Sequence, residues 1–476
     1  MASTADYQDL IPNNVNLRDN RKLLKALERW HPSFMEWWRD RGPVAFQENE
    51  IYLRTAVSVD SSGWAVYDYV RMPEYRWGIF LAPVKGERTI HFGDTIGGSA
   101  WDDVPGSFRN ELRRLIVTQG DTEPGSVEQQ RALSLIAPSL YDLRNLFQVN
   151  VEEARHLWAM VYLLHNFFGR DGRDEAEDML ARCSGDADSP RILSTFNDPI
   201  DDWLDFFCFA TFTDRDGKYQ LGSLAESAFT PLSQSTRFML TEEAHHLFVG
   251  ETGVTRTLRR TAQLMKENES GDVKPAGGIP ISIVQKYINY WYSASLDLFG
   301  SEDSTNAANY FSHGLKGRFN EANRRLYPDP TAREGEYLFE RFSPEKKKVE
   351  TVEIPVRRAM NAILRDAYIA DCVKVCARWN KALVREECPV GVQLPSVHFN
   401  RRVGAYSEAN FSPDGMIIDD AEWEKRCDEW LPTAADREYV RGAMVPVTER
   451  GQFANWIAPP ARGIHGKPIE FEYVRL

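Results

Sequence analysis

Apolar residues recur every three or four positions through much of the chain, which is the spacing of an amphipathic helix. This pattern predicts helices within residues 15–41, 108–168, 199–265, 280–326 and 352–385. Residues 50–95 differ, because β-branched and aromatic residues alternate there with polar ones and predict short strands. The expected fold is therefore mainly α, with small β and irregular segments.

The helical pattern is interrupted in three places. Residues 169–191 are polar, acidic and glycine-bearing, which indicates a surface excursion, and residues 266–278 have the composition of a linker. The C-terminal part is rich in Pro, Gly and Trp. We therefore expect four segments: 1–105 with a helix and short strands, 106–265 with a helical bundle, 266–386 with additional helices, and 387–476 as an irregular extension packed on the bundle.

The pentapeptide Glu-Glu-Ala-x-His occurs twice in the bundle segment, at 152–156 and at 242–246. In each copy a glutamate precedes a histidine by three positions, as Glu153 with His156 and Glu243 with His246. Residues three apart share one face of a helix, so each copy can direct a carboxylate and an imidazole to one point. A single match of this kind is weak evidence, but two copies within long amphipathic helices are much less easily explained by chance.

The second copy also contains Glu242 and His245 at the same spacing. Alignment of the two pentapeptides resolves this ambiguity, because His245 then takes the place of Arg155 in the first copy. We therefore expect His245 to lie outside the ligand set, either behind it or at the surface.

Two further carboxylates are expected from the helices that precede the pentapeptides. Glu123 lies 30 residues before Glu153, and Asp214 lies 29 residues before Glu243. About thirty residues allow a chain to descend one helix and climb the next to the same level, at ~1.5 Å per residue. An ordinary turn or cap acid is the alternative interpretation of each. Other acids fit the spacing less well, namely Glu111, Glu128, Asp205 and Glu226.

Four carboxylates and two imidazoles from four antiparallel helices are the ligand set of di-iron bundles. The carboxylates would neutralise two ferrous ions, and a set without thiolates favours iron or manganese over structural zinc. Glu152 and Glu242 could accept the second ring N–H of a ligand histidine, or they could be solvent-exposed helix acids. Gln119 lies one turn before Glu123 and could face the same pocket.

Composition narrows the function classes. The chain is 42% hydrophobic and 12% aromatic, as folded globular proteins are, and its net charge of −13 argues against nucleic-acid and membrane-surface binding. Neither a secretory signal nor an apolar run of transmembrane length is evident. The six cysteines are dispersed without a CxxC pair, which favours reduced thiols and a cytoplasmic location.

These motifs, together with IPNNVNL, TFTDRDGKYQL, FMLTEEAHHLFVGETGV, GLKGR and FANWIAPPARGI, resemble those of one family over nearly the whole chain. It is the oxygenase component of benzoyl-CoA 2,3-epoxidase, from the aerobic CoA-dependent benzoate pathway. The resemblance implies a ferritin-like di-iron carboxylate bundle within residues 106–265. It also implies that the iron ligands, and hence the catalytic residues, are Glu123, Glu153, His156, Asp214, Glu243 and His246.

The resemblance further implies that O₂ and two electrons convert benzoyl-CoA to its 2,3-epoxide and water. A separate flavin and iron–sulfur reductase would supply the electrons from NADPH. The sequence agrees, because it contains neither a GxGxxG loop after a strand nor a cysteine cluster for an iron–sulfur centre. The CoA phosphates would require a basic patch in segment 266–386. The candidates, which could instead form a solvated helix face, are Lys316, Arg318, Arg324 and Arg325.

Three alternative functions share the ligand pattern. A ribonucleotide reductase small subunit usually has a tyrosine four residues after the first ligand histidine, where this chain has Met160. A ferritin-like iron store would be a much shorter chain. Another di-iron aryl-CoA or hydrocarbon oxygenase, such as a phenylacetyl-CoA epoxidase-like enzyme, differs only in its substrate. Nothing in the sequence indicates the oligomeric state.

Overall fold

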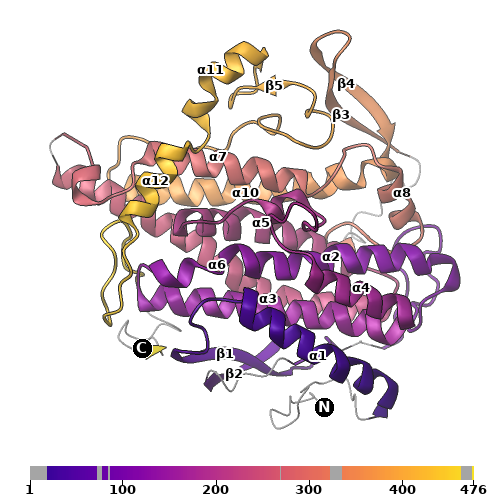
Figure 1. The fold of residues 1–476 in the computed structure, drawn as a ribbon. Coiled ribbons are helices and arrows are strands. Elements are labelled where there is room, and N and C mark those ends of the chain that lie inside the picture. Colours follow the sequence, from indigo (N-terminus) through magenta and orange to yellow (C-terminus); the bar gives the residue numbers. More distant parts are fainter. Residues whose placement is uncertain are drawn as a thin grey trace.

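The centre of the molecule is built from long helices that lie side by side (Figure 1). The computed structural model describes residues 19–71, 78–83, 86–268, 270–321, 335–462 and 474–475. The helices are α1 (Arg21–Arg41), α2 (Arg109–Gln130), α3 (Leu140–Phe167), α4 (Gly169–Ala181), α5 (Trp203–Leu224), α6 (Thr230–Glu267), α7 (Ile281–Asp297), α8 (Thr305–Ser312), α10 (Met360–Arg385), α11 (Asp420–Trp430) and α12 (Ala434–Ala443). The expected mainly α fold is confirmed.

Two helix pairs form the core, α2 with α3 and α5 with α6, and α3 also packs against α6. Local sequence signals set their starts. Ser139 caps α3 by accepting a hydrogen bond from the backbone N–H of Asp142, and Asp202 caps α5 in the same way through the N–H groups of Leu204 and Asp205. A proline occupies the first turn of α6, where its missing N–H costs nothing.

Helix α3 is buried on all sides, because every residue from Leu140 to His165 is buried. A helix of this kind is a core element rather than an amphipathic surface helix. It nevertheless carries several charged residues, which must find partners inside the protein. Glu152, Glu153 and His156 belong to the candidate site, whereas Asp142 pairs with Arg256.

The strands are β1 (Glu50–Val59), β2 (Ala65–Arg71), β3 (Glu336–Ser343), β4 (Lys348–Pro355), β5 (Asn410–Phe411), β6 (Ile417–Ile418) and β7 (Val474–Arg475). The antiparallel β1–β2 hairpin, extended by β7 beside β1, lies under α3 and α6 (Figure 1). It confirms the strands expected there, but the described residues 78–83 form none. The β3–β4 hairpin was not expected, and it occupies the start of the helix predicted at 352–385.

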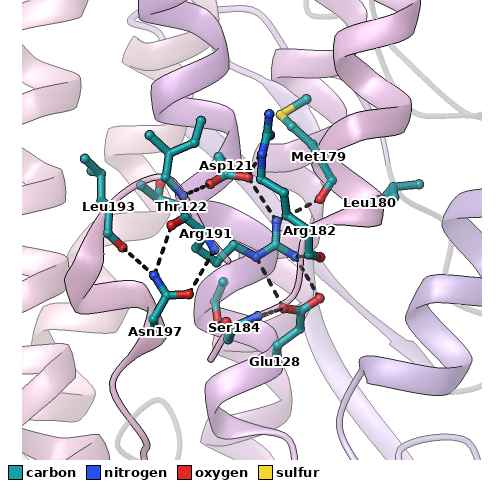
Figure 2. Close-up of polar contacts among 12 residues, drawn as sticks. Asp121, Thr122, Glu128, Met179, Leu180, Arg182, Ser184, Arg191, Leu193 and Asn197 are labelled. Atoms are coloured by element: carbon teal, nitrogen blue, oxygen red, sulfur yellow. Dashed lines mark hydrogen bonds and ion pairs between the residues drawn. The ribbon is translucent and has the colours of Figure 1, made fainter. Parts of the chain in front are cut away.

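The segment 169–191 is largely exposed or part-exposed, as expected of a surface excursion, but it is more ordered than its composition indicates. Its first half forms α4, and its second half returns to pack against α2 (Figure 2). The side chain of Arg191 is fully buried and donates hydrogen bonds to Asp121 at 3.0 Å and to Glu128 at 2.7 Å, besides two backbone carbonyls near the end of α4. We call Arg191, Asp121 and Glu128 the Arg191 cluster. The cluster holds the returning loop against α2 through Asp121 and Glu128, which lie on either side of Glu123 along this helix.

Apolar residues from all four predicted segments meet in one hydrophobic core, for example Trp30, Phe147, Trp379 and Trp456. The division into four segments remains a prediction. Within the described residues, no helix has both the length and the apolar character that a membrane span requires.

Candidate metal centre

The six predicted ligands come together in the space enclosed by α2, α3, α5 and α6, and all of them are buried. Glu123 comes from α2 and Asp214 from α5, while each Glu–His pair comes from α3 or α6. The i and i+3 spacing places both members of each pair on the inner face of their helix.

Among the described residues, two groups of three side chains are close enough to bind a metal ion. One consists of Glu123, Glu153 and His156, and the other of Glu153, Glu243 and His246. Within each triad one ligand atom per residue can be chosen such that all three lie within 4.8 Å of one another. Glu153 belongs to both triads, and the two imidazole centroids are 5.9 Å apart. This arrangement fits two neighbouring ions that share a bridging carboxylate.

Both histidines turn Nδ1 toward the carboxylates. Nδ1 of His156 lies 3.4 Å from Glu123 and 3.6 Å from Glu153, and Nδ1 of His246 lies 3.4 Å from Glu153 and 3.5 Å from Glu243. These separations are too long for good hydrogen bonds. Among the described residues neither Nδ1 atom has a hydrogen-bond partner. Buried donors are rarely left so, and a metal ion between imidazole and carboxylates would satisfy both.

The outer ring nitrogens are held by the remaining glutamates of the pentapeptides, in a crossed arrangement. Nε2 of His156 lies 3.1 Å from Glu242, and Nε2 of His246 lies 3.2 Å from Glu152. Each acid therefore orients the histidine of the other copy. Both acids are fully buried, so the solvent-exposed interpretation is wrong. We call Glu152 and Glu242 the outer acids.

The outer acids are themselves satisfied by buried partners. Glu242 pairs with Arg155 at 3.1 Å, and Glu152 accepts a hydrogen bond from Gln148 at 2.7 Å. Carboxylates that hold the second nitrogen of a ligand histidine fix its ring and increase its basicity. His245, in contrast, is only partly buried and faces a second cavity, in agreement with its expected place outside the ligand set.

The electrostatics of the centre show why it needs cations. Burial, reinforced by Glu123, raises the pKa of Glu153 well above its usual range, and burial beside Glu243 and Glu123 raises the pKa of Asp214 to about 8. Burial alone would lower the pKa of His156, but the surrounding carboxylates raise it well above the ordinary value. Without metal the centre must therefore retain protons, and metal ions would displace them.

Asp214 lies outside both triads but faces the same cavity. The cavity has a volume of about 140 Å³, and its wall includes Glu123, Glu153, Glu243 and Asp214. Oδ2 of Asp214 has no hydrogen-bond partner among the described residues. The four predicted carboxylates therefore line this cavity, and the two histidines lie beside these carboxylates.

Three of the competing acids have partners elsewhere. Glu128 belongs to the Arg191 cluster, Asp205 accepts a hydrogen bond from Trp291 at 2.8 Å, and Glu111 lies 3.0 Å from His313. The spacing of about thirty residues therefore identified, among the candidate acids, Glu123 and Asp214, which face the centre.

The predicted substrate-binding residues lie in different places. Gln119 lines the cavity and donates a hydrogen bond to Glu123 at 3.0 Å. Lys316 also lines the cavity, and its ammonium donates to Gln220 at 2.6 Å. Arg318 is buried and pairs with Glu321 at 2.8 Å. Arg324 and Arg325 lie outside the described residues, so contact of these basic groups with phosphates remains a prediction.

Sequence reasoning missed the α5 face of the cavity. Thr213, Gly217, Gln220 and Leu224 all line it. Their spacing of four, three and four residues is that of one helix face, and this period could have identified them once Asp214 was proposed.

We predict that Glu152→Gln weakens metal binding about 10–100-fold, mainly at the position held by Glu243 and His246, because Glu152 contacts His246. A stepwise Mn²⁺ titration followed by electron paramagnetic resonance would separate the two affinities. Glu242→Gln is the matched control and should weaken the other position instead. Equal effects of the two variants at both positions would contradict the crossed arrangement.

Comparison with known proteins supplies an independent finding. No family model matches the sequence. The chain is 54% identical over 474 residues to the protein named benzoyl-CoA oxygenase component B from Aromatoleum evansii, and the alignment covers 99% of each chain.

Proposed function

Because the chain belongs to the family of benzoyl-CoA oxygenase component B, we propose that it is a di-iron monooxygenase component that epoxidises benzoyl-CoA at the 2,3 positions. It would use O₂ and electrons from a separate NADPH-dependent reductase. The observation that carries this proposal is the pair of buried triads that share Glu153, beside a cavity.

Glu123, Glu153 and His156 would hold one iron, and Glu153, Glu243 and His246 the other, with Asp214 completing the set from α5. Carboxylate and imidazole ligands without thiolate suit ferrous ions, which supply the reducing power that O₂ activation requires. The protein's own contribution is to hold these ligands in place. The outer acids fix both imidazoles, and Gln119 orients the carboxylate of Glu123.

The cavity suits a benzoyl ring. Its volume of about 140 Å³ is close to the roughly 150 Å³ of an engineered cavity that binds benzene. Leu115, Phe196 and Leu298 contribute apolar surface to its wall, which would help to keep the ring near the metals. Lys316 is the cation on the wall, and we propose that it faces the thioester end of the substrate.

An electron-donating partner follows from the reaction balance. One oxygen atom of O₂ enters the ring and the other leaves as water, which consumes two electrons and two protons. The chain has six dispersed, free cysteines and no nucleotide-phosphate loop, so a separate reductase has to deliver the electrons. The word component in the relative's name is consistent with an enzyme that consists of more than one protein.

The test is turnover of the iron-loaded protein with benzoyl-CoA, NADPH, O₂ and the reductase of a benzoyl-CoA oxygenase system. We expect O₂ uptake that requires every component and a product one oxygen atom heavier than the substrate by mass spectrometry. Free benzoate, the matched control, should give no product. Equal turnover of benzoate, or oxidation of hydrocarbons but not of the thioester, would favour a different di-iron oxygenase.

A further inference from the structure

A second, larger cavity lies on the other side of α3 and α6 from the metal centre. The metal cavity is bordered by α2 and α5, whereas the second cavity is bordered by β1 and β2 (Figure 1). Its volume is about 810 Å³, within the range typical of organic ligands. None of the proposed metal ligands lines it.

Arg144 of α3 is the most unusual residue of this cavity. It is only 2% exposed, yet Nε and Nη2 have no hydrogen-bond partner among the described residues. Its one hydrogen bond goes to the amide oxygen of Asn145 at 3.2 Å. Burial lowers the pKa of Arg144 to about 10, and the neighbouring Arg54 lowers it as well. A buried guanidinium without a counter-ion is costly and indicates that an anion is missing.

Other charges on the cavity wall make the contrast clear. Arg256 pairs with Asp142 at 2.7 Å, and Arg259 pairs with Glu386 at 3.0 Å. Arg54, in contrast, lies over the ring of Tyr67 at 4.0 Å, and its Nε has no hydrogen-bond partner within the described part of the chain. Of the described residues, Arg54 and Arg144 are therefore the buried or part-buried cations of this wall without a paired carboxylate, while Arg462 on the same wall is exposed.

Glu152 is a nearby carboxylate, but it does not fill this role. It interacts electrostatically with Arg54 and Arg144, yet its side chain is already engaged by His246 and Gln148. In the described part of the structure Glu152 forms no ion pair with either arginine, so both guanidinium groups remain available to an anion of a bound molecule.

Aromatic rings form much of the remaining wall. Tyr67 and Tyr141 lie near the two arginines, and Trp64 and Phe248 are 58% and 50% exposed, respectively, although both are large apolar side chains. Exposed aromatic faces next to guanidinium groups suit a planar ring joined to an anionic group.

We propose that this second cavity binds an organic phosphate with a planar aromatic ring, the phosphate on Arg144 and Arg54 and the ring against the aromatic wall. Guanidinium groups match phosphate oxygens in geometry as well as charge. Two sources share this chemistry, the adenosine phosphate of a CoA molecule and a flavin mononucleotide. The site has a different lining from the metal cavity, and binding there does not require metal.

The test is isothermal titration of the full-length protein, with and without metal, against adenosine 3′,5′-bisphosphate, flavin mononucleotide and inorganic phosphate. We expect one of the two aromatic phosphates to bind once per chain, at least about 10-fold tighter than inorganic phosphate, and equally well without metal. Which of the two binds distinguishes the sources. Persistence of binding in an inactive, metal-free protein separates this proposal from the proposed function.

Arg144→Met should weaken that binding at least about 10-fold, because it removes the buried cation but keeps most of the volume. The melting temperature of the variant should equal or exceed that of the wild type, because no ion pair is lost. Arg54→Gln provides a second, partly exposed position. Arg170→Met, at a side chain that is 86% exposed, is the matched control and should bind normally.

Three results would overturn the proposal. The first is wild-type protein that binds neither aromatic phosphate better than inorganic phosphate. The second is unchanged affinity in both Arg144→Met and Arg54→Gln. The third is binding of the aromatic phosphate that is lost when the metal is removed.

Discussion

Replacing Glu153 with alanine is expected to empty both metal positions at once. Glu153 is the one residue common to the two triads, so its loss leaves each position with two ligands of its triad. Metal content should fall from about two ions per chain to well below one, and epoxide formation should fall to background. Inductively coupled plasma mass spectrometry on the purified variant measures the first quantity, and product analysis the second.

Two comparison variants show whether the loss of both ions is specific to Glu153. Glu123→Ala removes a ligand of one triad only and should leave about one ion per chain. Glu267→Ala, at a side chain on α6 that is 60% exposed, should keep the full metal content. Circular dichroism should show that all three variants are folded. A Glu153→Ala protein that still binds two ions would show that the ions do not share this carboxylate.

The convergence of the proposed ligands could be predicted because local rules determine where these side chains lie. The i and i+3 spacing is a property of any helix, and a fixed rise per residue brings Glu123 level with Glu153. The crossed contacts of the outer acids could not be predicted, because they depend on how closely α3 and α6 approach each other. Spacing along one helix contains no information about that distance.

The basic residues show a second limit of sequence reasoning. Lys316 and Arg318 were predicted to belong to one basic patch, but they lie in an irregular segment after α8. Lys316 faces the metal cavity, whereas Arg318 pairs with Glu321. Without helical or strand periodicity, proximity in sequence does not predict a common direction.

Composition correctly indicated a surface segment at residues 169–191, but it did not reveal the helix in the first half or the burial of Arg191. Gly172 permits close packing of α4, since a Cβ at this position would lie 2.1 Å from the carbonyl oxygen of Leu164. Acidic residues are also not always exposed. On α2, the side chains of Asp121 and Glu128 are buried partners of Arg191. A buried ion pair between distant segments leaves no trace in composition.

Arg191→Met is expected to destabilise the protein by about 3–5 kcal/mol, because it leaves two buried carboxylates without their cation. Asp121 and Glu128 would then have to be protonated or exposed to water. Urea unfolding followed by circular dichroism measures the loss. Arg170→Met, at an exposed arginine on α4, should change the free energy of unfolding by no more than about 0.5 kcal/mol.

The same variant tests whether the Arg191 cluster also supports the metal centre. Asp121 and Glu128 lie on either side of Glu123 along α2, so a loosened cluster should weaken the triad of Glu123 more than that of Glu243. Neutralising both Asp121 and Glu128 in the Arg191→Met background should recover part of the free energy of unfolding, because no unpaired buried charge then remains. A loss below about 1 kcal/mol, or no recovery in the triple variant, would mean that packing rather than charge holds this loop on α2.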